Sequence, residues 1–267
     1  MPLWRLKNLV DPDESAPRAA HLTWNDVDYL AGGDLAIVFL GIADDAAYFG
    51  LDVSELNESA SKELAGRRLF TELRTVGPLL PAGEGALLAY ARGMLYWHSR
   101  HKFCGRCGGA TKSLEGGHRR LCERRSCRAS HFPRVDPAVI VLVSDGDRCL
   151  LGRQPRWPAK LYSALAGFVE PGESLEEAVA REVKEETGVT VRRIRYHSSQ
   201  PWPFPGSLML GFTAEAATTE IELDRNELQD ARWVARDALD AAATKGVRLP
   251  HADSLARRLI DGWLAKR

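Results

Sequence analysis

The spacing of apolar residues in the first hundred positions predicts a small mixed unit of strands and helices. Apolar runs at residues 35–40 and 47–51 have the length of strands, and residues 84–100 carry apolar side chains at near-helical intervals. This last helix is expected to end just before a group of cysteines. We therefore predict an N-terminal α+β domain that leads directly into a cysteine-rich segment.

The rest of the chain alternates strand-like runs with two helical segments. Apolar runs at residues 138–143 and 149–151 flank Asp145-Gly146-Asp147, a turn sequence typical of a hairpin. Helical spacing covers residues 174–187 and 253–264. Further strands are expected near residues 162–168, 192–197, 208–214 and 230–234. This order predicts an α/β fold for the second half of the chain.

Composition limits the class of protein further. The chain has 267 residues, 45% of them hydrophobic and 27% charged, which is long enough for about two domains and excludes bulk disorder. Its 36 Lys and Arg balance its 36 Asp and Glu, so no overall charge attracts nucleic acid. The N-terminus lacks a signal-peptide pattern, and the apolar runs are far shorter than the roughly 18 residues of a spanning helix. We expect a cytoplasmic protein with no membrane partner.

Four of the five cysteines fall in one short window as Cys104-x2-Cys107 and Cys122-x4-Cys127. Two such pairs suit a closed tetrahedral zinc site, in which the metal replaces a missing apolar core. The alternatives are a redox pair or two disulfides, which an intracellular chain disfavours. A four-thiolate site has no open position for catalysis, so we assign this zinc to structure. The fifth cysteine, Cys149, is expected to be a small buried side chain.

Acidic residues gather on the helix expected over residues 174–187. Ser174 and Glu177 form a capping box, and Gly188 is placed to end the helix. The carboxylates of this helix lie one turn apart on the face opposite the apolar residues, at Glu182, Glu185 and Glu186. A solvated acidic face, with Arg181 and Lys184 as partners, is the alternative explanation.

A glycine-rich loop that ends in Glu173 directly precedes this helix and favours a functional explanation. Four carboxylates in one strand-loop-helix unit suit the hard cations Mg²⁺ and Mn²⁺. These cations in turn suit a substrate that carries phosphate groups. The sequence therefore predicts a divalent metal site at this helix.

The segment resembles the Nudix motif G-x5-E-x7-R-E-U-x-E-E-x-G-U, where U is a bulky aliphatic residue. The matching residues are Gly167, Glu173, Arg181, Glu182, Val183, Glu185, Glu186, Gly188 and Val189. The resemblance implies an α/β/α sandwich that hydrolyses a nucleoside diphosphate linked to another group, with divalent metal held by the glutamates. It makes Glu182 and Glu186 metal ligands, lets Glu185 complete the metal shell, and has Arg181 hold a glutamate in place. One carboxylate of the set that includes Glu173 would act as the base.

A proline-rich segment follows downstream. Its residues are Ser199, Gln200, Pro201, Trp202, Pro203, Phe204, Pro205, Gly206 and Ser207. Three prolines in five residues predict a rigid extended loop whose aromatic rings suit a flat heterocycle and whose Gln200 and Ser207 can hydrogen-bond a ligand. A loop with its aromatic rings in the core is the alternative.

This segment resembles the S-Q-P-W-P-F-P-x-S element of the NADH pyrophosphatase branch of the Nudix family, which also carries a four-cysteine zinc ribbon and a divergent N-terminal domain. The resemblance makes the segment from Gln200 to Ser207 substrate-binding and implies a homodimer. It further implies a metal-binding carbonyl at Ala166, a metal ligand at Glu227, nucleotide contact at Ala256, and nicotinamide stacking by Phe168 and Phe132.

Two positions depart from the usual pattern of that branch. Four residues separate Cys122 from Cys127 where many members have two, and Phe132 stands where others can carry Tyr. The first change is expected to lengthen the ribbon loop, and the second to remove a hydroxyl contact to the substrate. The expected parts are an N-terminal domain (1–100), a zinc ribbon (101–133) and a Nudix catalytic domain (134–267).

The predicted activity is hydrolysis of NADH or NAD⁺ to nicotinamide mononucleotide and AMP. An enzyme that removes NAD caps from RNA is the alternative, with the same chemistry. Residues 100–134 carry ten Lys and Arg against Glu115 and Glu123 and could follow phosphates, although such cations could also offset the zinc-bound thiolates. A third reading, a zinc-ribbon binding module with a degenerate enzyme domain, conflicts with the complete motif.

Overall fold

The chain folds as two compact units. In the computed structural model, which describes all residues except 13–15, 31–34, 44, 241–245 and 267, the first unit comprises Met1–Val135 with Pro203–Gly206. The second unit comprises Asp136–Trp202 with Ser207–Arg267. The first unit thus contains both the N-terminal segment and the cysteine segment. Their separation into two domains stays a prediction.

The second unit is built on a six-stranded sheet in the order β13-β14-β10-β11-β15, with β12 also paired to β10. Its strands are β10 (Asp136–Asp145), β11 (Arg148–Arg153), β12 (Leu165–Phe168), β13 (Val191–Trp202), β14 (Ser207–Ala216) and β15 (Asp230–Ala235). Strands β10 and β14 run parallel, and the remaining pairs are antiparallel. The expected strands are therefore present, and the largest differences are that β12 begins at Leu165 and that β13 continues to Trp202.

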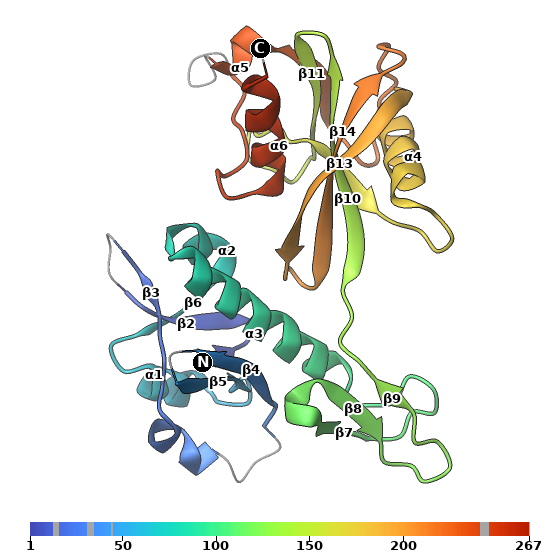
Figure 1. Cartoon of the computed structure of the whole chain (residues 1–267). Helices are drawn as coiled ribbons and strands as arrows, with labels where there is room; N and C mark the ends of the chain where they lie inside the picture. The colour runs from blue at the N-terminus through green and yellow to red at the C-terminus, as the bar shows by residue number, and fades with distance from the viewer. Residues whose placement is uncertain (13–15, 31–34, 44, 241–245, 267) are drawn as a thin grey trace. The chain divides into compact units, whose positions relative to one another are not determined.

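Helices α4 (Leu175–Thr187) and α6 (Leu255–Leu264) lie on opposite faces of this sheet (Figure 1), and the short α5 spans Arg236–Asp240. Side chains alternate along β10, so Val141 packs into the core under α4 and Leu142 into the core under α6. This arrangement confirms the α/β/α sandwich. Among the described residues, no helix has the length and apolarity that crossing a bilayer requires.

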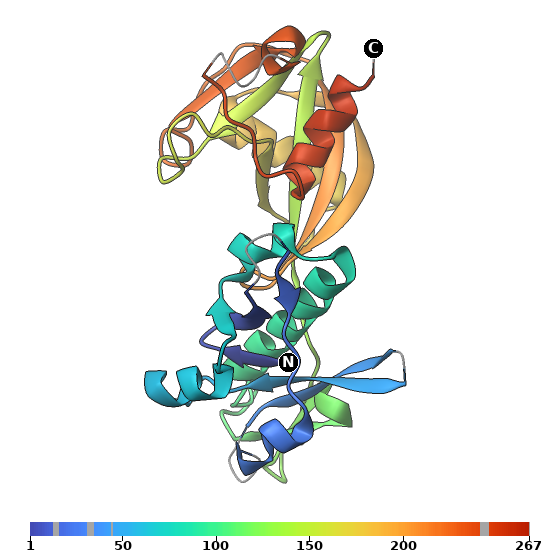
Figure 2. The same cartoon turned by 90° about the vertical axis from the view of Figure 1, so that its left-hand side faces the viewer.

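The first unit contains a second six-stranded sheet, in the order β3-β2-β1-β5-β4 with β6 paired to β2. Its strands are β1 (Pro2–Trp4), β2 (Lys7–Asp11), β3 (Arg18–Ala19), β4 (Ile37–Ala43), β5 (Ala46–Asp52) and β6 (Leu69–Thr71). Its helices are α1 (Glu58–Ala65), α2 (Leu73–Val76) and α3 (Ala82–Arg100), with short 3₁₀ turns at Trp24–Asp26, Asp28–Leu30 and Gly77–Leu79. Helix α3 lies along the sheet (Figure 2), and a Cβ at Gly50 would contact Leu95 at 3.4 Å.

The cysteine segment forms a small sheet of β7 (Thr111–Leu114), β8 (Arg119–Cys122) and β9 (Ser130–His131), with a 3₁₀ turn at Glu115–Gly117. A buried polar network joins this ribbon to α3. The Nε2 of His98 lies 2.7 Å from the carbonyl of Gly117, and Arg120 places Nη1 2.8 Å from His98 Nδ1. Burial lowers the pKa of His98 to about 4, so the imidazole is neutral and accepts from the guanidinium.

Candidate functional site

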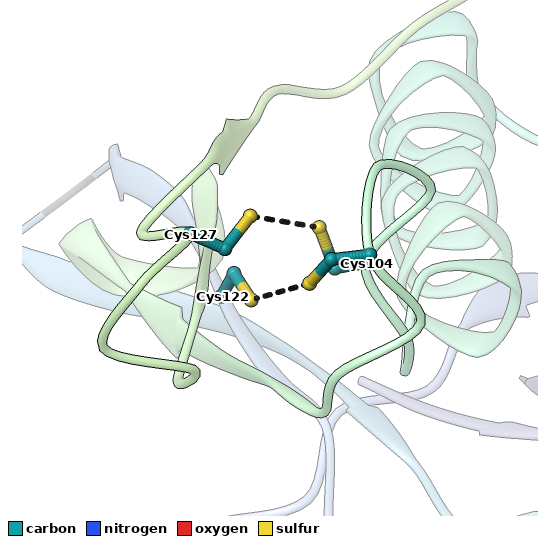
Figure 3. Close-up of side chains that lie close together, drawn as sticks. Cys104, Cys122 and Cys127 are labelled. Carbon is teal, nitrogen blue, oxygen red and sulfur yellow. Dashed lines mark hydrogen bonds between the residues drawn. The ribbon is translucent and has the colours of Figure 1, made fainter.

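The four sulfurs of Cys104, Cys107, Cys122 and Cys127 lie within 4.8 Å of one another in the ribbon. The sulfur pairs Cys104–Cys127 and Cys107–Cys122 are 3.9 and 3.5 Å apart (Figure 3). A tetrahedron with metal–sulfur bonds of about 2.3 Å has edges of about 3.8 Å, so these separations fit zinc. They are far longer than a disulfide bond of about 2.05 Å, and all five cysteines are free. The ribbon geometry supports a structural zinc site.

Contacts to Cys104 and Cys107 lower the pKa of these two thiols, whereas burial raises the pKa of Cys122 to about 12. A backbone N–H of Gly109 lowers the pKa of the Cys107 thiol to about 7, and the Nε2 of His131 lies 3.3 Å from the Sγ of Cys104. His131 thus contacts one of the four predicted zinc ligands. Cys149 is fully buried in the second unit, and burial raises its pKa to about 12, which makes it unreactive.

Helix α4 begins and ends where its local sequence predicts. Ser174 accepts from the backbone N–H of Glu177, the Glu177 carboxylate accepts from the backbone N–H of Ser174, and Gly188 closes the helix at φ 71°. These caps set the two ends of the helix, and Ala178, Val179 and Val183 pack it against the sheet. The hydrogen bond from Arg181 to the carbonyl of Phe168 then links the helix to the end of β12.

Arg181 is the centre of an ion-pair network on this helix. Its guanidinium donates to both carboxylate oxygens of Glu173, at 2.6 and 3.0 Å, and also to Glu182 and Glu185, each at 2.9 Å. A fifth hydrogen bond, of 2.9 Å, goes to the carbonyl of Phe168. The bond with Arg181 lowers the pKa of Glu173 and raises that of Arg181. The Arg181 side chain thus connects Glu173, in the loop before α4, with Glu182 and Glu185 on the helix.

Glu182 and Glu186 are buried, with 9% and 4% of their surface exposed, whereas Glu185 is exposed. Burial, reinforced by the charges of Glu182 and Glu227, raises the pKa of Glu186 to about 8. Burial also raises the pKa of Glu182, against the opposing effect of Arg181. The idea of a solvated acidic face is therefore wrong for these two residues.

One oxygen of this set lacks a partner. The Oε2 of Glu186 is buried and has no hydrogen bond among the described residues. A buried carboxylate oxygen without a donor is unfavourable unless a cation faces it. Hard oxygen ligands of this kind fit Mg²⁺ or Mn²⁺. Among the described residues of the second unit, no carboxylates meet as compactly as the four cysteines of the ribbon.

Two further predicted ligands lie next to these carboxylates. Ala166 lies on β12, where it pairs with Ile140 of β10. Glu227 is exposed in the segment before β15, and its charge reaches both Glu182 and Glu186. That segment is tied to the end of α4, since the backbone N–H of Asp224 donates to the carbonyl of Glu186 at 3.1 Å. Their roles as metal ligands stay predictions.

The proline-rich segment is less of a loop than the sequence predicts. Pro201 and Trp202 continue β13, pairing with Leu208 and Ser207 of β14, because Pro201 lies on an edge strand where a missing N–H is tolerated. The turn between the strands is Pro203–Gly206, within the first unit. There Phe204 packs on an apolar cluster and lies 5.1 Å from the Arg92 guanidinium. Its ring is thus part of a packed region, as the structural alternative expects.

The side chain of Gln200 makes two hydrogen bonds that the sequence did not indicate. Its Nε2 donates to the carbonyl of Asp253 at 2.8 Å, and its Oε1 accepts from the backbone N–H of Leu255 at 2.7 Å. Both bonds fix the start of α6, where Ala256 is buried. The rings of Phe132 and Phe168 are exposed by 57% and 59%. Contact of these residues with a substrate stays a prediction.

Three family models match consecutive parts of this chain. Residues 1–97 match the NADH pyrophosphatase-like rudimentary NUDIX domain, residues 99–132 the NADH pyrophosphatase zinc ribbon domain, and residues 134–257 the NUDIX domain. A crystal structure of a NUDIX hydrolase from Nitrosomonas europaea matches 62% of this chain and 92% of that chain, with a TM-score of 0.50 and 22% identity. That likeness supports the fold.

Curated relatives match over most of this chain. The human protein named NAD-capped RNA hydrolase NUDT12 is 38% identical over 92% of this chain and 61% of its own length. The protein named NAD-capped RNA hydrolase NudC from Stutzerimonas stutzeri is 48% identical over 68% of this chain and 62% of its own length. Nudix hydrolase 19, chloroplastic, from Arabidopsis thaliana is 45% identical over 78% of this chain and 50% of its own length. The chain thus spans between half and about three fifths of these relatives.

Proposed function

The chain belongs to the NUDIX family, and we propose that it hydrolyses the diphosphate bond of NADH or NAD⁺ to give nicotinamide mononucleotide and AMP. The observation that carries the proposal is the buried oxygen of Glu186 without a partner, beside the network that Arg181 organises. The match to the NADH pyrophosphatase-like domain supports the choice of substrate. The names of the curated relatives also support it.

In this proposal Glu182, Glu186 and Glu227 hold Mg²⁺ or Mn²⁺, together with the carbonyl of Ala166. The cation would neutralise the diphosphate and make phosphorus more electrophilic. Arg181 positions Glu182 and Glu185 through its 2.9 Å hydrogen bonds and anchors the loop through Glu173. A carboxylate of this set accepts the proton of the attacking water. Exposed Phe168, with Gln200, Pro201, Trp202 and Ser207 of the same unit, would receive the nucleotide.

The test is incubation of the purified protein with NADH and Mg²⁺ or Mn²⁺, with separation of the products. Both mononucleotides are expected in equal amounts. Glu186→Gln should keep the fold and lose most turnover, whereas Glu176→Gln, at an exposed position of the same helix, should retain it. Absence of product at high enzyme concentration would contradict the proposal.

Removal of NAD caps from RNA is a second candidate, favoured by the names of the curated relatives. The bond broken is the same, so the carboxylate site serves both substrates. Release of 5′-monophosphate RNA from an NAD-capped transcript, compared with a triphosphate transcript as control, tests this activity.

We further propose that the protein acts as a homodimer and that Phe132 contributes to the nicotinamide site from the partner subunit, as the family resemblance implies. The 57% exposure of the Phe132 ring supports this role. Light scattering of the purified protein would measure the mass of the assembly. A monomer with full activity would contradict the role of a second subunit.

A further inference from the structure

The segment between β14 and β15 is fastened to the last turn of α4. The last carbonyl groups of a helix have no acceptor role within it and need donors from elsewhere. The carbonyl of Thr187 accepts from the backbone N–H of Glu222 at 2.8 Å. The carbonyl of Glu186 accepts from the backbone N–H of Asp224 at 3.1 Å. Gly188 permits this approach, because a Cβ atom there would lie 2.8 Å from the Cβ of Glu222. The segment is therefore held at the end of the helix that carries Glu186.

Asp224 begins one tight turn of the chain directly after this attachment. Its Oδ1 accepts from the backbone N–H of Asn226 at 2.8 Å and from the side-chain amide of Asn226 at 2.9 Å. Its carbonyl accepts from the backbone N–H of Leu228 at 2.9 Å. These are the bonds of a residue that caps the first turn of a helix. An acceptor oxygen on the side chain of residue 224 thus sets the path of the backbone over residues 225–228.

Glu227 lies in this turn, just before two anchored positions. Leu228 is 3% exposed and packs in the core under α4. The backbone N–H of Gln229 donates to the carbonyl of Arg153 on β11 at 2.8 Å. Glu227 itself is exposed, yet its charge acts on α4, since burial raises the pKa of Glu186 and the charges of nearby glutamates, Glu227 among them, raise it further. The turn therefore brings a third carboxylate close to the buried pair on α4.

We propose that Asp224 is a positioning residue, which places Glu227 at the metal site through this turn and does not bind the cation itself. The inference rests on the proposed function, in which Glu186 and Glu227 hold the cation. It deepens that proposal by naming the residue that brings the two ligands together. The backbone N–H of Asp224 bonds to Glu186, while its carboxylate shapes the turn that contains Glu227. This role requires an acceptor oxygen and no charge, so asparagine should be able to replace aspartate.

The first experiment measures binding of Mn²⁺ alone, without substrate, from the electron paramagnetic resonance signal of the free ion. Glu227→Gln and Asp224→Ala should each bind Mn²⁺ about 10- to 100-fold more weakly than wild type, on the scale of lost metal ligands and of residues that orient them. Asp224→Asn should stay within about threefold of wild type, because its amide oxygen still accepts from Asn226. The control is Asp261→Ala, an exposed aspartate on α6 that pairs with Arg257, which should change the affinity less than about twofold.

The double variant Asp224→Ala/Glu227→Gln tests whether Asp224 acts through Glu227. If it does, the double variant binds Mn²⁺ no more weakly than Glu227→Gln, because the turn then has no ligand left to place. Losses that add up would overturn the inference, since Asp224 would then contribute to the site by itself. An Asp224→Asn variant as weak as Asp224→Ala would overturn it too, because the charge of Asp224 would then matter more than the turn.

The second experiment measures turnover of NADH while Mn²⁺ is varied. Asp224→Ala should need about 10- to 100-fold more Mn²⁺ for half-maximal rate and recover most of kcat at saturating Mn²⁺. A loss of kcat that saturating Mn²⁺ does not restore would contradict a role in placing a metal ligand. The melting temperature in chelator, expected to fall by about 4 °C or less, verifies the fold. If the alanine variant does not fold, Asp224→Ser takes its place, with an intermediate loss of Mn²⁺ affinity expected because serine forms such turns more weakly.

The outcomes separate the role of Asp224 from the proposed activity. Wild-type protein that binds Mn²⁺ and does not cleave NADH refutes the proposed function, while the binding titration still tests Asp224. Unchanged Mn²⁺ affinity in Glu227→Gln would overturn the inference, because the turn would then carry no ligand. Unchanged affinity in Asp224→Ala would overturn it as well, because Glu227 would then reach the cation without the turn.

Discussion

The Cδ of Glu182 lies 1.9 Å from the position that a Cβ atom on Gly167 would take. No side chain can stand at residue 167 while this carboxylate keeps its place. The glycine thus leaves the space that lets a buried glutamate of α4 approach strand β12. The Nudix motif begins with glycine here for a steric reason that involves two of its own positions.

Gly167→Ala should therefore displace Glu182 and impair catalysis. A shift of about 1 Å in a catalytic group lowers the rate on the order of 100-fold, so we expect a loss of that size in kcat for NADH. Gly262→Ala is the control, because its Cβ would meet only His197 Nε2 at 3.7 Å. Near wild-type kcat in Gly167→Ala would show that the Glu182 carboxylate can move without effect.

Arg181→Lys should retain charge and lose the network. A lysine has one nitrogen and cannot reproduce the two bonds to Glu173 together with those to Glu182, Glu185 and the Phe168 carbonyl. We expect a loss of activity of about 10- to 100-fold, on the scale of residues that position metal ligands. Lys184→Gln, an exposed change on the same helix, should be silent. Steady-state kinetics with varied Mg²⁺ distinguishes weaker metal binding from slower chemistry.

The raised pKa of Glu186, about 8, predicts that the metal-free protein loses stability as pH rises. The ordinary pKa of a glutamate is 4.5. Between pH 4.5 and about 8, Glu186 therefore holds a proton in the folded protein that it has released in the unfolded chain. This contribution is therefore complete below pH 4.5 and lost as pH rises through 8, with each pKa unit worth about 1.4 kcal/mol. Thermal unfolding in chelator from pH 5.5 to 8.5 should show the fall, as about three pH units cover the window.

Glu186→Gln is the matched variant for that series, because the amide cannot ionise. Its melting temperature should change less over the same pH range. Added Mg²⁺ should restore the wild-type protein at high pH and leave the variant unaffected. A pH profile shared by both proteins would assign the effect to other groups.

Cys122→Ser should remove zinc and unfold the ribbon. The other three sulfurs cannot close the tetrahedron, and the small sheet of β7, β8 and β9 has little apolar core to replace it. Zinc content by atomic absorption and amide exchange of the β7–β8 pair are the measurements. Cys149→Ala, in the other unit, should keep its full complement of zinc. Retained zinc in Cys122→Ser would show that the cysteines do not form one site.

Local signals explain what the sequence could predict. The bounds of α4 were expected to within one residue, since the Ser174 and Glu177 capping box and Gly188 act on the helix that contains them. The strand expected over 162–168 begins later, at Leu165, because Tyr162 and Ser163 bond to Arg248 and Gly152 only in isolated bridges and not in a continuous ladder. Strands such as β3, with two residues, are too short to show a period.

Contacts between residues that are far apart in the sequence could not be predicted from these local signals. Spacing placed Glu182 and Glu186 on one helix face, but their burial depends on strand β12 and on the segment around Glu227. The three glutamates bound by Arg181 and the hold of Gln200 on α6 likewise depend on side-chain geometry that no periodicity encodes. The family resemblance supplied residue positions there, whereas the structure supplied their partners.

The hydrogen bond between His98 and Arg120 limits how far the chain can be shortened from its N-terminus. A protein shortened to residues 99–267 would lack the imidazole that accepts from the Arg120 guanidinium, at a cost of about 1.5–3 kcal/mol for the lost hydrogen bond, while the two bonds of Arg120 to Thr111 remain. The ribbon and the hydrolase domain are therefore not expected to fold correctly together when the first 98 residues are removed. A fragment of that length should be recovered insoluble or short of zinc, and a soluble fragment with full zinc would show that the ribbon is self-sufficient. The first hundred residues carry no part of the Nudix motif. They nevertheless supply the hydrogen-bond acceptor on which the buried arginine of the ribbon depends.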